Sequence, residues 1–196
     1  MTELPPIQTA PGKKAAKPKN TRKEILSWIL TLVAAVAIAL VVRTFLFEPI
    51  RVDGESMTDT LQNGELMLVT KPEYIFGSPQ RQDVIICRYP NRKEYFVKRL
   101  IGLPGDTVEI KYDSKAGINR VYVNGEALDE SYLTPSRDNN PDTYGPVTLE
   151  EDQYFVLGDN RDNSNDSRYV GELHRSQIVG HVRFVFYPFA GARTVE

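Results

Sequence analysis

Ser56 and Lys98 are two residues whose types could together carry out nucleophilic catalysis in this 196-residue chain. Ser56 lies in Gly54-Glu-Ser-Met-Thr-Asp-Thr-Leu61, and a serine between small residues at the end of a strand can be an exposed nucleophile. A lysine that stays neutral near pH 7 can accept the proton of a serine hydroxyl. Each residue also has an ordinary alternative, because Ser56 could cap a turn or a helix and Lys98 could be a surface lysine on an edge strand. Neither residue establishes catalysis alone.

The surroundings of Lys98 favour burial. It lies in Tyr95-Phe-Val-Lys-Arg-Leu-Ile101, a run that is apolar apart from Lys98 and Arg99. Consecutive side chains of a strand point to opposite faces, so either Lys98 or Arg99 must point toward the covered side of the sheet. Burial disfavours the ammonium form and lowers the pKa of a lysine. The run therefore predicts a strand that could carry a general base.

A third stretch, Gly158-Asp-Asn-Arg-Asp-Asn-Ser-Asn-Asp-Ser-Arg168, is dense in side-chain donors and acceptors. A calcium loop is one candidate, but the EF-hand spacing fails. Counting from Asp162, position six is Ser167 instead of Gly, and position twelve is Leu173 instead of Glu. We interpret the stretch as a hydrogen-bonded scaffold of Asp–Arg pairs and Ser hydroxyls that holds an active site.

Metal and nucleic-acid chemistry have little support in the composition. One cysteine, Cys87, and two histidines, His174 and His181, are too few for a usual zinc site. We therefore expect no metal and no cofactor. The 24 basic and 26 acidic residues nearly balance, which gives a nucleic-acid partner no electrostatic support.

Short strands are the elements that must position these residues. Runs rich in β-branched and aromatic residues predict strands, and Asn124-Gly125 between two such runs predicts a hairpin. The predicted strand segments are 65–70, 83–87, 95–101, 107–112, 121–128, 153–157 and 182–187. Residues 113–150 are rich in Pro, Asp and Asn, which indicates a looped subregion. The predicted fold is a mostly β domain, either a sheet or a barrel.

An apolar segment precedes these strands. Residues 25–42 carry no charge, and 18 helical residues span about 27 Å, close to the thickness of the bilayer's hydrocarbon core. A buried core helix and a cleavable signal peptide are the alternatives, but the run is long for a signal peptide and no small-x-small cleavage site follows it. The basic residues at 13–23 predict a cytoplasmic N-terminus.

The expected organisation follows from these patterns. It comprises a disordered basic cytoplasmic tail at 1–24, a transmembrane helix at 25–47 and an extracytoplasmic β-rich domain at 48–196. The localisation that this predicts is a single-pass protein of the cell membrane, with its catalytic domain on the outer face.

The stretches around Ser56, from Tyr95 to Asp106 and from Gly158 to Arg168, in this order behind an anchor, resemble the bacterial type I signal peptidases, or leader peptidases. The resemblance runs from about Arg43 to Tyr187. It implies a β-rich catalytic domain against the membrane surface. The implied substrates are preproteins with small residues one and three positions before the cut.

The resemblance also implies residue roles. Ser56 would be the nucleophile, Lys98 the general base, and Ser164 a group that hydrogen-bonds and orients Lys98. The backbone N–H of Ser56 would serve the oxyanion hole. The other implied site residues are Gly54, Met57 and Val97 on the oxyanion and substrate side, and Asp159, Arg161, Asp166 and Arg168 as a polar frame with an Asp166–Arg168 ion pair.

Two positions depart from the family pattern. Asp59 stands where many members have proline in Ser-Met-x-Pro-Thr-Leu, which puts a charge near the nucleophile. Gly54 stands where some members have a serine whose hydroxyl helps to form the oxyanion hole, so the second donor stays open.

Two rival functions remain from the sequence. A self-cleaving repressor would use a related Ser–Lys site, but it would carry a DNA-binding module where this chain has an apolar helix. An inactive, membrane-anchored protein that binds secretory chains would keep the fold and lose the catalytic pair. Secretory preproteins and the lipid bilayer are the expected partners in the peptidase reading.

Overall fold

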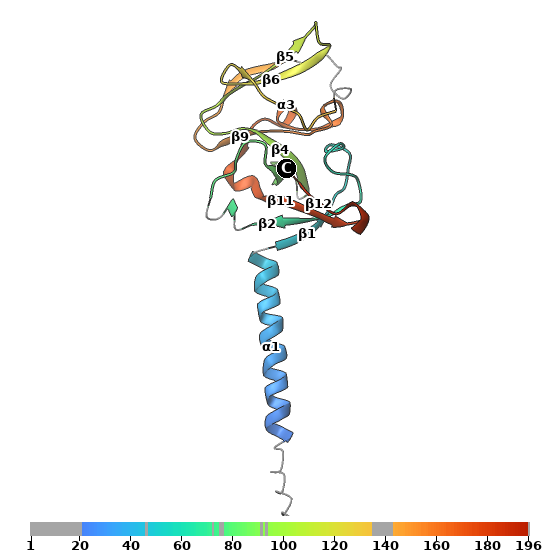
Figure 1. Cartoon of the computed structure of the whole chain (residues 1–196). Coiled ribbons are helices and arrows are strands. Elements are labelled where there is room, and N and C mark those ends of the chain that lie inside the picture. The colour runs from blue at the N-terminus through green and yellow to red at the C-terminus, as the bar shows by residue number, and fades with distance from the viewer. Residues whose placement is uncertain are drawn as a thin grey trace, which may run out of the picture. The chain divides into compact units, whose positions relative to one another are not determined.

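The computed structural model of the chain describes residues 21–45, 47–71, 73–74, 77–90, 92, 94–134 and 143–195. The chain divides into two compact units, residues 1–40 and residues 41–196 (Figure 1). We describe each unit by itself.

Helix α1 (Thr21–Phe45) contains neither proline nor glycine and is rich in alanine, leucine and valine. Its residues 21–42 are long and apolar enough to cross a membrane, and none of that hydrophobic window is buried within the protein. The helix begins at Thr21, so residues 21–24 of the predicted tail are helical. Residues 1–20 lie outside the described residues.

The main sheet has eight strands, all paired antiparallel, in the spatial order β1-β2-β11-β3-β4-β9-β10, with β12 beside β11. Strand β11 therefore joins the β1–β2 pair to the β3–β4 pair. The strands are β1 (Phe47–Arg51), β2 (Leu66–Thr70), β3 (Val84–Arg88), β4 (Tyr95–Gly102), β9 (Gln153–Leu157), β10 (Leu173–His174), β11 (Ile178–Tyr187) and β12 (Arg193–Thr194).

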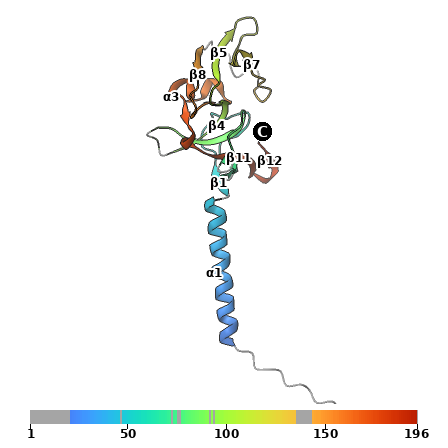
Figure 2. The ribbon, with the colours of Figure 1, turned by 90° about the vertical axis from the view of Figure 1, so that its left-hand side faces the viewer.

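A second, four-stranded sheet has the order β7-β6-β5-β8. Its strands are β5 (Thr107–Asp113), β6 (Ile118–Val123), β7 (Glu126–Ala127) and β8 (Tyr144–Thr148). Asn124 and Gly125 connect β6 to β7 with φ angles of 54° and 84°, which are the positive values a tight hairpin turn needs. The predicted hairpin is thus confirmed. Figures 1 and 2 both show β5 at the opposite end of the domain from β1.

The range 113–150 holds more regular structure than its composition indicates. Strands β6, β7 and β8 lie within it and form most of the second sheet. Between β7 and β8, residues 128–134 run outside the sheets, and residues 135–142 lie outside the described part of the chain. The looped segment is therefore shorter than the sequence predicts.

Three clusters of buried apolar side chains fill the domain. One lies between the β1–β2 region and β11, a second beside β3 and β9, and a third between the two sheets. Short helical turns complete the fold: η1 (Arg161–Asn163), α3 (Ser167–Val170), η2 (Arg175–Gln177) and η3 (Phe189–Gly191). The mostly β fold class predicted from the sequence is confirmed.

Candidate active site

Ser56 and Lys98 meet although 42 positions separate them in sequence. Lys98 Nζ lies 2.7 Å from Ser56 Oγ, within hydrogen-bond distance. The same nitrogen donates to the backbone carbonyl of Val97 at 3.0 Å. Ser56 comes from the turn after β1, and Lys98 comes from the middle of β4. The geometry required for a lysine to take the serine proton is therefore present without substrate.

Lys98 is almost fully enclosed, with 2% of its surface exposed. Burial lowers the pKa of its ammonium group, while the nearby Cys87, Asp166 and Asp159 act in the opposite direction. Cys87 itself lies in the core, and burial raises the pKa of its thiol to about 12, so it stays neutral near pH 7. The balance favours a lysine that loses its proton more easily than an exposed one.

Residues 55–61, which we call the nucleophile turn, are held by short-range and long-range contacts. Within the turn, the backbone N–H groups of Thr60 and Leu61 donate to the Met57 carbonyl at 3.0 and 2.8 Å. The side chains of Met57 and Leu61 are buried. From the polar stretch, the Asn160 N–H donates to the Ser56 carbonyl at 3.0 Å, which fixes the peptide plane after the nucleophile.

A cleft of about 540 Å³ opens at the catalytic pair. Its lining includes Ser56 and Lys98 together with all three residues predicted for the oxyanion and substrate side, Gly54, Met57 and Val97. Ile86 on β3 adds an apolar wall. The structure therefore brings the five predicted residues to one cavity.

The oxyanion side is organised by a loop with unusual backbone angles. Gly54 has a φ of 110°, and its N–H donates to Asn63 Oδ1 at 3.2 Å. Asp59, which takes the place of the family's proline, has a φ of 109°, a conformation that L-residues rarely adopt. Its carboxylate accepts the Thr134 N–H at 3.3 Å. The departure at position 59 is thus accompanied by a contact to a distant segment.

Ser164 lies beside the pair but does not make the hydrogen bond to Lys98 that the resemblance implies. Its Oγ is buried and has no hydrogen-bond partner among the described residues. A methyl group placed on Gly158 would lie 2.3 Å from Ser164 Oγ and 2.5 Å from the Ser56 carbonyl. Gly158 therefore lets the polar stretch approach the back of the nucleophile, with Ser164 against it.

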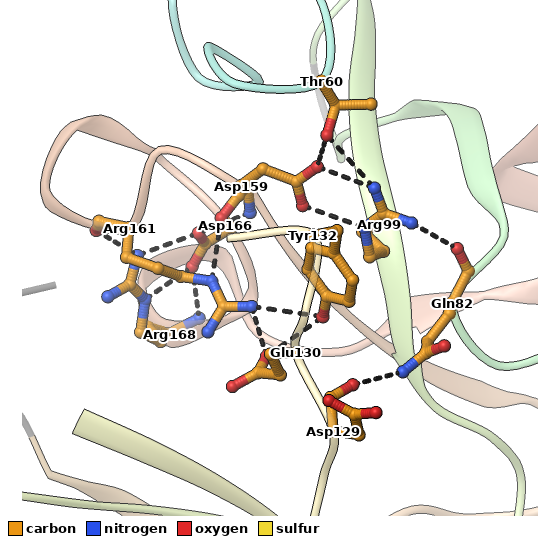
Figure 3. Close-up of polar contacts among 11 residues, drawn as sticks. Thr60, Gln82, Arg99, Asp129, Glu130, Tyr132, Asp159, Arg161, Asp166 and Arg168 are labelled. Carbon is orange, nitrogen blue, oxygen red and sulfur yellow. Dashed lines mark hydrogen bonds and ion pairs between the residues drawn. The ribbon is translucent and has the colours of Figure 1, made fainter. Parts of the chain in front are cut away.

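Asp159 forms a buried ion pair that the sequence did not predict. Arg99 Nε and Nη2 donate to the two oxygens of its carboxylate at 3.0 and 2.8 Å, and both side chains are at most 1% exposed (Figure 3). Thr60 donates to the same carboxylate from the nucleophile turn. Arg99 and Lys98 are adjacent on β4 and both buried, so both faces of this strand are covered.

The other predicted frame residues form a second, neighbouring group. Asp166 pairs with Arg168, whose Nε lies 2.9 Å from its carboxylate, and accepts the Gly158 N–H at 3.0 Å. Arg168 donates to the Arg161 carbonyl at 2.7 Å, and Arg161 Nε donates to the Gly158 carbonyl at 3.0 Å. These bonds shape the loop that contacts the back of Ser56.

Two residues of the site had no signal in the sequence. Glu130 and Tyr132, from the segment between β7 and β8, contact Arg161 and Arg99 (Figure 3). Their partners lie about 30 positions away, so neither periodicity nor a local motif could have found them. Thr60 belongs to the family motif around Ser56, but its contact with Asp159 was not predicted.

The described residues contain no group of three or more His, Cys, Asp or Glu side chains arranged to hold a metal ion. Of the two histidines, His181 is buried against Glu73, with Nδ1 2.7 Å from the carboxylate, and stacks on Tyr74. His174 lies 3.3 Å from Asp152 on the surface. Neither histidine contacts the catalytic pair.

Comparisons with known proteins point to one family. A family model described as "Signal peptidase, peptidase S26" matches residues 25–187. Signal peptidase I S of Bacillus subtilis (strain 168) is 42% identical over 179 residues, which covers 87% of this chain and 93% of that protein. Signal peptidase I of Bacillus licheniformis is 38% identical over 188 residues, 92% of this chain and 98% of that protein. A crystal structure of a signal peptidase I from Enterococcus faecalis V583 is 37% identical and covers 53% of this chain and 96% of its own, with a TM-score of 0.45.

Proposed function

Because the chain belongs to the signal peptidase family, peptidase S26, and is a serine endopeptidase of that family, we propose that it removes signal peptides from exported preproteins with Ser56 as nucleophile and Lys98 as general base. The observation that carries the assignment of roles is the 2.7 Å approach of Lys98 Nζ to Ser56 Oγ in a buried setting.

The mechanism follows from the protonation state of Lys98. As the neutral amine, Nζ accepts the hydroxyl proton while Ser56 Oγ attacks the scissile carbonyl carbon. The resulting ammonium then gives its proton to the leaving amine, and an ester to Ser56 remains. Lys98 next takes a proton from a water molecule, which attacks the ester carbon. The Lys98 ammonium then returns that proton to Ser56 Oγ as the ester bond breaks, which releases the signal peptide and restores the free enzyme. Burial of Lys98 supports both steps because it favours the neutral form.

Specificity for small side chains would come from the apolar lining of the cleft. Met57 is 2% exposed and Ile86 is fully buried, so the side chains that form the wall of the cleft are packed in the core and cannot easily move aside. Such a wall suits alanine one and three positions before the cut and penalises larger residues. The oxyanion would take the Ser56 N–H as one donor. The Gly54 N–H is engaged by Asn63, so the second donor must come from elsewhere.

Ser164 keeps its proposed role as the group that orients Lys98. A buried hydroxyl without a partner costs about 1–3 kcal/mol, so its pairing with the Lys98 ammonium that forms during the reaction would be favourable. Asp159, Arg161, Asp166 and Arg168 would act indirectly, since they shape the loop behind Ser56 and do not line the cleft.

Membrane location is proposed from α1 and from the basic residues before it. The helix is apolar on all sides and its residues 25–42 are free of charge, while residues 13–23 contain six basic residues and no acidic one. This asymmetry supports a topology with the tail in the cytoplasm and the peptidase domain on the outer face. Protease added to intact spheroplasts should then digest the domain and leave an epitope on the tail protected. Digestion of the tail alone would contradict this topology.

Cleavage of a preprotein tests the enzymatic proposal. The detergent-solubilised full chain should cut a preprotein with an Ala-x-Ala site at one bond, and Ser56→Ala and Lys98→Ala should each abolish the cut while circular dichroism shows an unchanged fold. Wild-type turnover in either variant would remove the proposed dyad. Binding of the preprotein by the wild-type chain without any cut would favour the inactive binding protein instead.

A further inference from the structure

We propose that residues 129–134, which we call the clasp, hold the nucleophile turn in its catalytic position, with Tyr132 as the central positioning residue. The clasp follows β7 of the second sheet, and its Glu130 pairs with Arg161 of the polar frame (Figure 3). The inference rests on the proposed function, because it takes Ser56 as the nucleophile.

Tyr132 covers the buried ion pair of the site. The guanidinium carbon of Arg99 lies 3.8 Å from the centre of the Tyr132 ring, a close cation–π contact. Arg99 in turn holds Asp159, and both residues bind the Thr60 hydroxyl of the nucleophile turn, Arg99 at 3.2 Å. The ring therefore acts on the turn through one buried layer of side chains and touches neither Ser56 nor Lys98.

Glu130 anchors the same ring to the loop on the other side. The Tyr132 hydroxyl donates to Glu130 Oε1 at 3.0 Å, and Arg161 pairs with the same oxygen. Arg161 Nε donates to the carbonyl of Gly158, the residue packed against the Ser56 carbonyl. A second tie comes from Gln82, which donates to the Asp129 carbonyl while its own carbonyl accepts from Arg99.

The third contact is direct. The Thr134 N–H donates to Asp59 Oδ2 at 3.3 Å, and Asp59 is the turn residue with a φ of 109°. A non-glycine residue in such a conformation costs on the order of 1–3 kcal/mol and persists only where its surroundings hold it. The clasp supplies such a restraint at the middle of the nucleophile turn.

The two sides of the clasp differ in a way that singles out Tyr132. Asp129, Glu130, Ser131, Leu133 and Thr134 all line an open cavity of about 590 Å³ on the side of the second sheet. Tyr132 does not line this cavity and points to Arg99 instead. Since five of its six residues line an open cavity, the inward contacts of the clasp are the ones that can fix its position.

The expected effect is on catalysis and much less on substrate binding. None of the clasp residues lines the cleft at Ser56, so their loss should leave KM unchanged. A shift of the nucleophile by about 1 Å can cost about 100-fold in rate, so kcat should fall. A looser turn would also admit water to Lys98 and move its pKa back toward that of an exposed lysine.

The experiment compares three variants of the full chain in detergent, cleaving the Ala-x-Ala preprotein. Tyr132→Leu removes the ring, Tyr132→Phe keeps it, and Tyr122→Leu is the matched control, since Tyr122 carries a Lys111 cation–π contact elsewhere in the second sheet. We expect Tyr132→Leu to lower kcat at least about tenfold, with KM within about twofold and the acid limb of kcat/KM moved to higher pH. Tyr122→Leu should stay within about twofold of wild type in kcat. Tyr132→Phe keeps the ring on Arg99 but loses the bond to Glu130, so its kcat should lie between those of the wild type and Tyr132→Leu.

A second pair of variants keeps the test decisive if Tyr132→Leu does not fold. Asp59→Asn keeps an acceptor oxygen and tolerates a positive φ, whereas Asp59→Ala loses the Thr134 contact. Of these two variants, we expect only Asp59→Ala to lower kcat. The proposed role of the clasp would be wrong if folded Tyr132→Leu kept the wild-type kcat, or if Tyr122→Leu lost as much kcat as Tyr132→Leu. It would also be wrong if the two Asp59 variants had the same kcat. Ser56→Ala separates the two proposals. If it still cleaves the preprotein, the proposed Ser56–Lys98 dyad is wrong. If it is inactive while the clasp variants have normal activity, only the proposed role of the clasp is wrong.

Discussion

Lys98 combines two properties that rarely occur together, nearly complete burial and a hydrogen-bond partner that is itself a weak acid. Its Nζ has the Ser56 hydroxyl and the Val97 carbonyl as its contacts in the structure, and burial lowers the pKa of its ammonium. Near the catalytic pair, the frame carboxylates are already taken up by arginines. The lysine is therefore positioned beside negative charge without being directly paired to it.

The pH dependence of cleavage should report this environment. Lys98 must lose its proton to act as a base, so kcat/KM should rise with pH and level off above the pKa of Lys98. Because burial lowers that pKa, the midpoint of the rise should lie below about 10.4, the value of an exposed lysine. Measuring kcat/KM between pH 5 and 11 gives the midpoint of this rise. A limb centred at the ordinary lysine value would contradict the role of burial.

Lys98→Met should abolish cleavage and stabilise the fold. The folded-state pKa of Lys98 lies below its unfolded-state pKa, so below the unfolded value protonation favours the unfolded chain. The resulting loss of folding stability grows as the pH falls from the pKa of Lys98 in the unfolded chain to its pKa in the folded chain. Below the folded-state pKa the loss is constant. We expect a gain on the order of 1 kcal/mol at pH 7 by denaturant unfolding, shrinking toward pH 10.5. A destabilised variant at pH 7 would show that the ammonium is well accommodated.

Ser164→Ala should separate catalysis from stability. One hydrogen bond to a charged group is worth about 1.5–3 kcal/mol, so kcat should fall roughly 10- to 100-fold if Ser164 orients the Lys98 ammonium. The Ser164 hydroxyl is buried and has no partner within the described part of the chain, so its removal should not lower the melting temperature. Single-turnover kinetics and calorimetry measure the two quantities. A normal kcat would exclude the orienting role.

At the residue scale, motif and spacing predict the centre of the site but not its support. Ser56, Lys98, Gly54, Met57 and Val97 were expected to act together, and all five line one cleft. The partner of Arg99 could not be predicted, because the alternation of side chains along a strand shows only that neighbouring residues point to opposite faces of the sheet. Which of them is buried depends on what covers each face, and here elements from three parts of the chain do so.

Strand β4 is the element on which the site depends. It runs in the interior of the main sheet, between β3 and β9, and presents Lys98 to one face and Arg99 to the other. Lys98 contacts Ser56, and Arg99 contacts Asp159 and Thr60. A shift of the β4 register by one residue would exchange the two side chains, so correct pairing with β3 decides whether the site forms.

Gly158→Ala should lower activity by displacing the loop that packs against the Ser56 carbonyl. The added methyl would lie 2.3–2.6 Å from Ser164 Oγ, the Ser56 carbonyl and Ser164 Cβ, so the nucleophile turn or the polar loop must move. We expect a loss of activity of about 100-fold and a destabilisation of about 1–3 kcal/mol, measured by preprotein cleavage and urea unfolding.

Gly191→Ala is the matched control for this substitution. A methyl there meets no atom closer than 3.8 Å, and the residue lies in η3. It should keep wild-type activity and stability. Equal effects of the two substitutions would show that the close approach at Gly158 is unimportant.

At the element scale, strands rich in β-branched and aromatic residues were predicted, and strands that contain proline were not. Strands β2, β3, β4, β5 and β9 match runs rich in β-branched and aromatic residues. Strand β1 contains Pro49, and β8 contains Gly145 and Pro146, which argue against strands in a local pattern. Proline is tolerated in β1 because the strand lies at the sheet edge. Edge position is a tertiary property that the sequence does not display.

At the scale of the whole molecule, Trp28 is a built-in reporter of membrane insertion. It is the chain's single tryptophan and lies near one end of the apolar segment, with 77% of its surface exposed within the protein. In lipid vesicles its fluorescence should shift to the blue and be quenched more by bromine atoms near the headgroups than by those at the bilayer centre. Emission that is unquenched by any brominated lipid would contradict insertion of α1.

Strand β11 sets when the enzyme can become active during its own synthesis. Ser56 follows β1, Lys98 lies on β4, and β11 is the strand inserted between the β1–β2 and β3–β4 pairs. Arg193 in the adjoining β12 also binds the Thr60 carbonyl of the nucleophile turn at 2.6 Å. The nucleophile and its base therefore belong to two halves that stay unjoined until residues 178–194 have emerged and paired. On the proposed roles of Ser56 and Lys98, a newly made chain would therefore gain its peptidase activity only after this last part of the domain has folded.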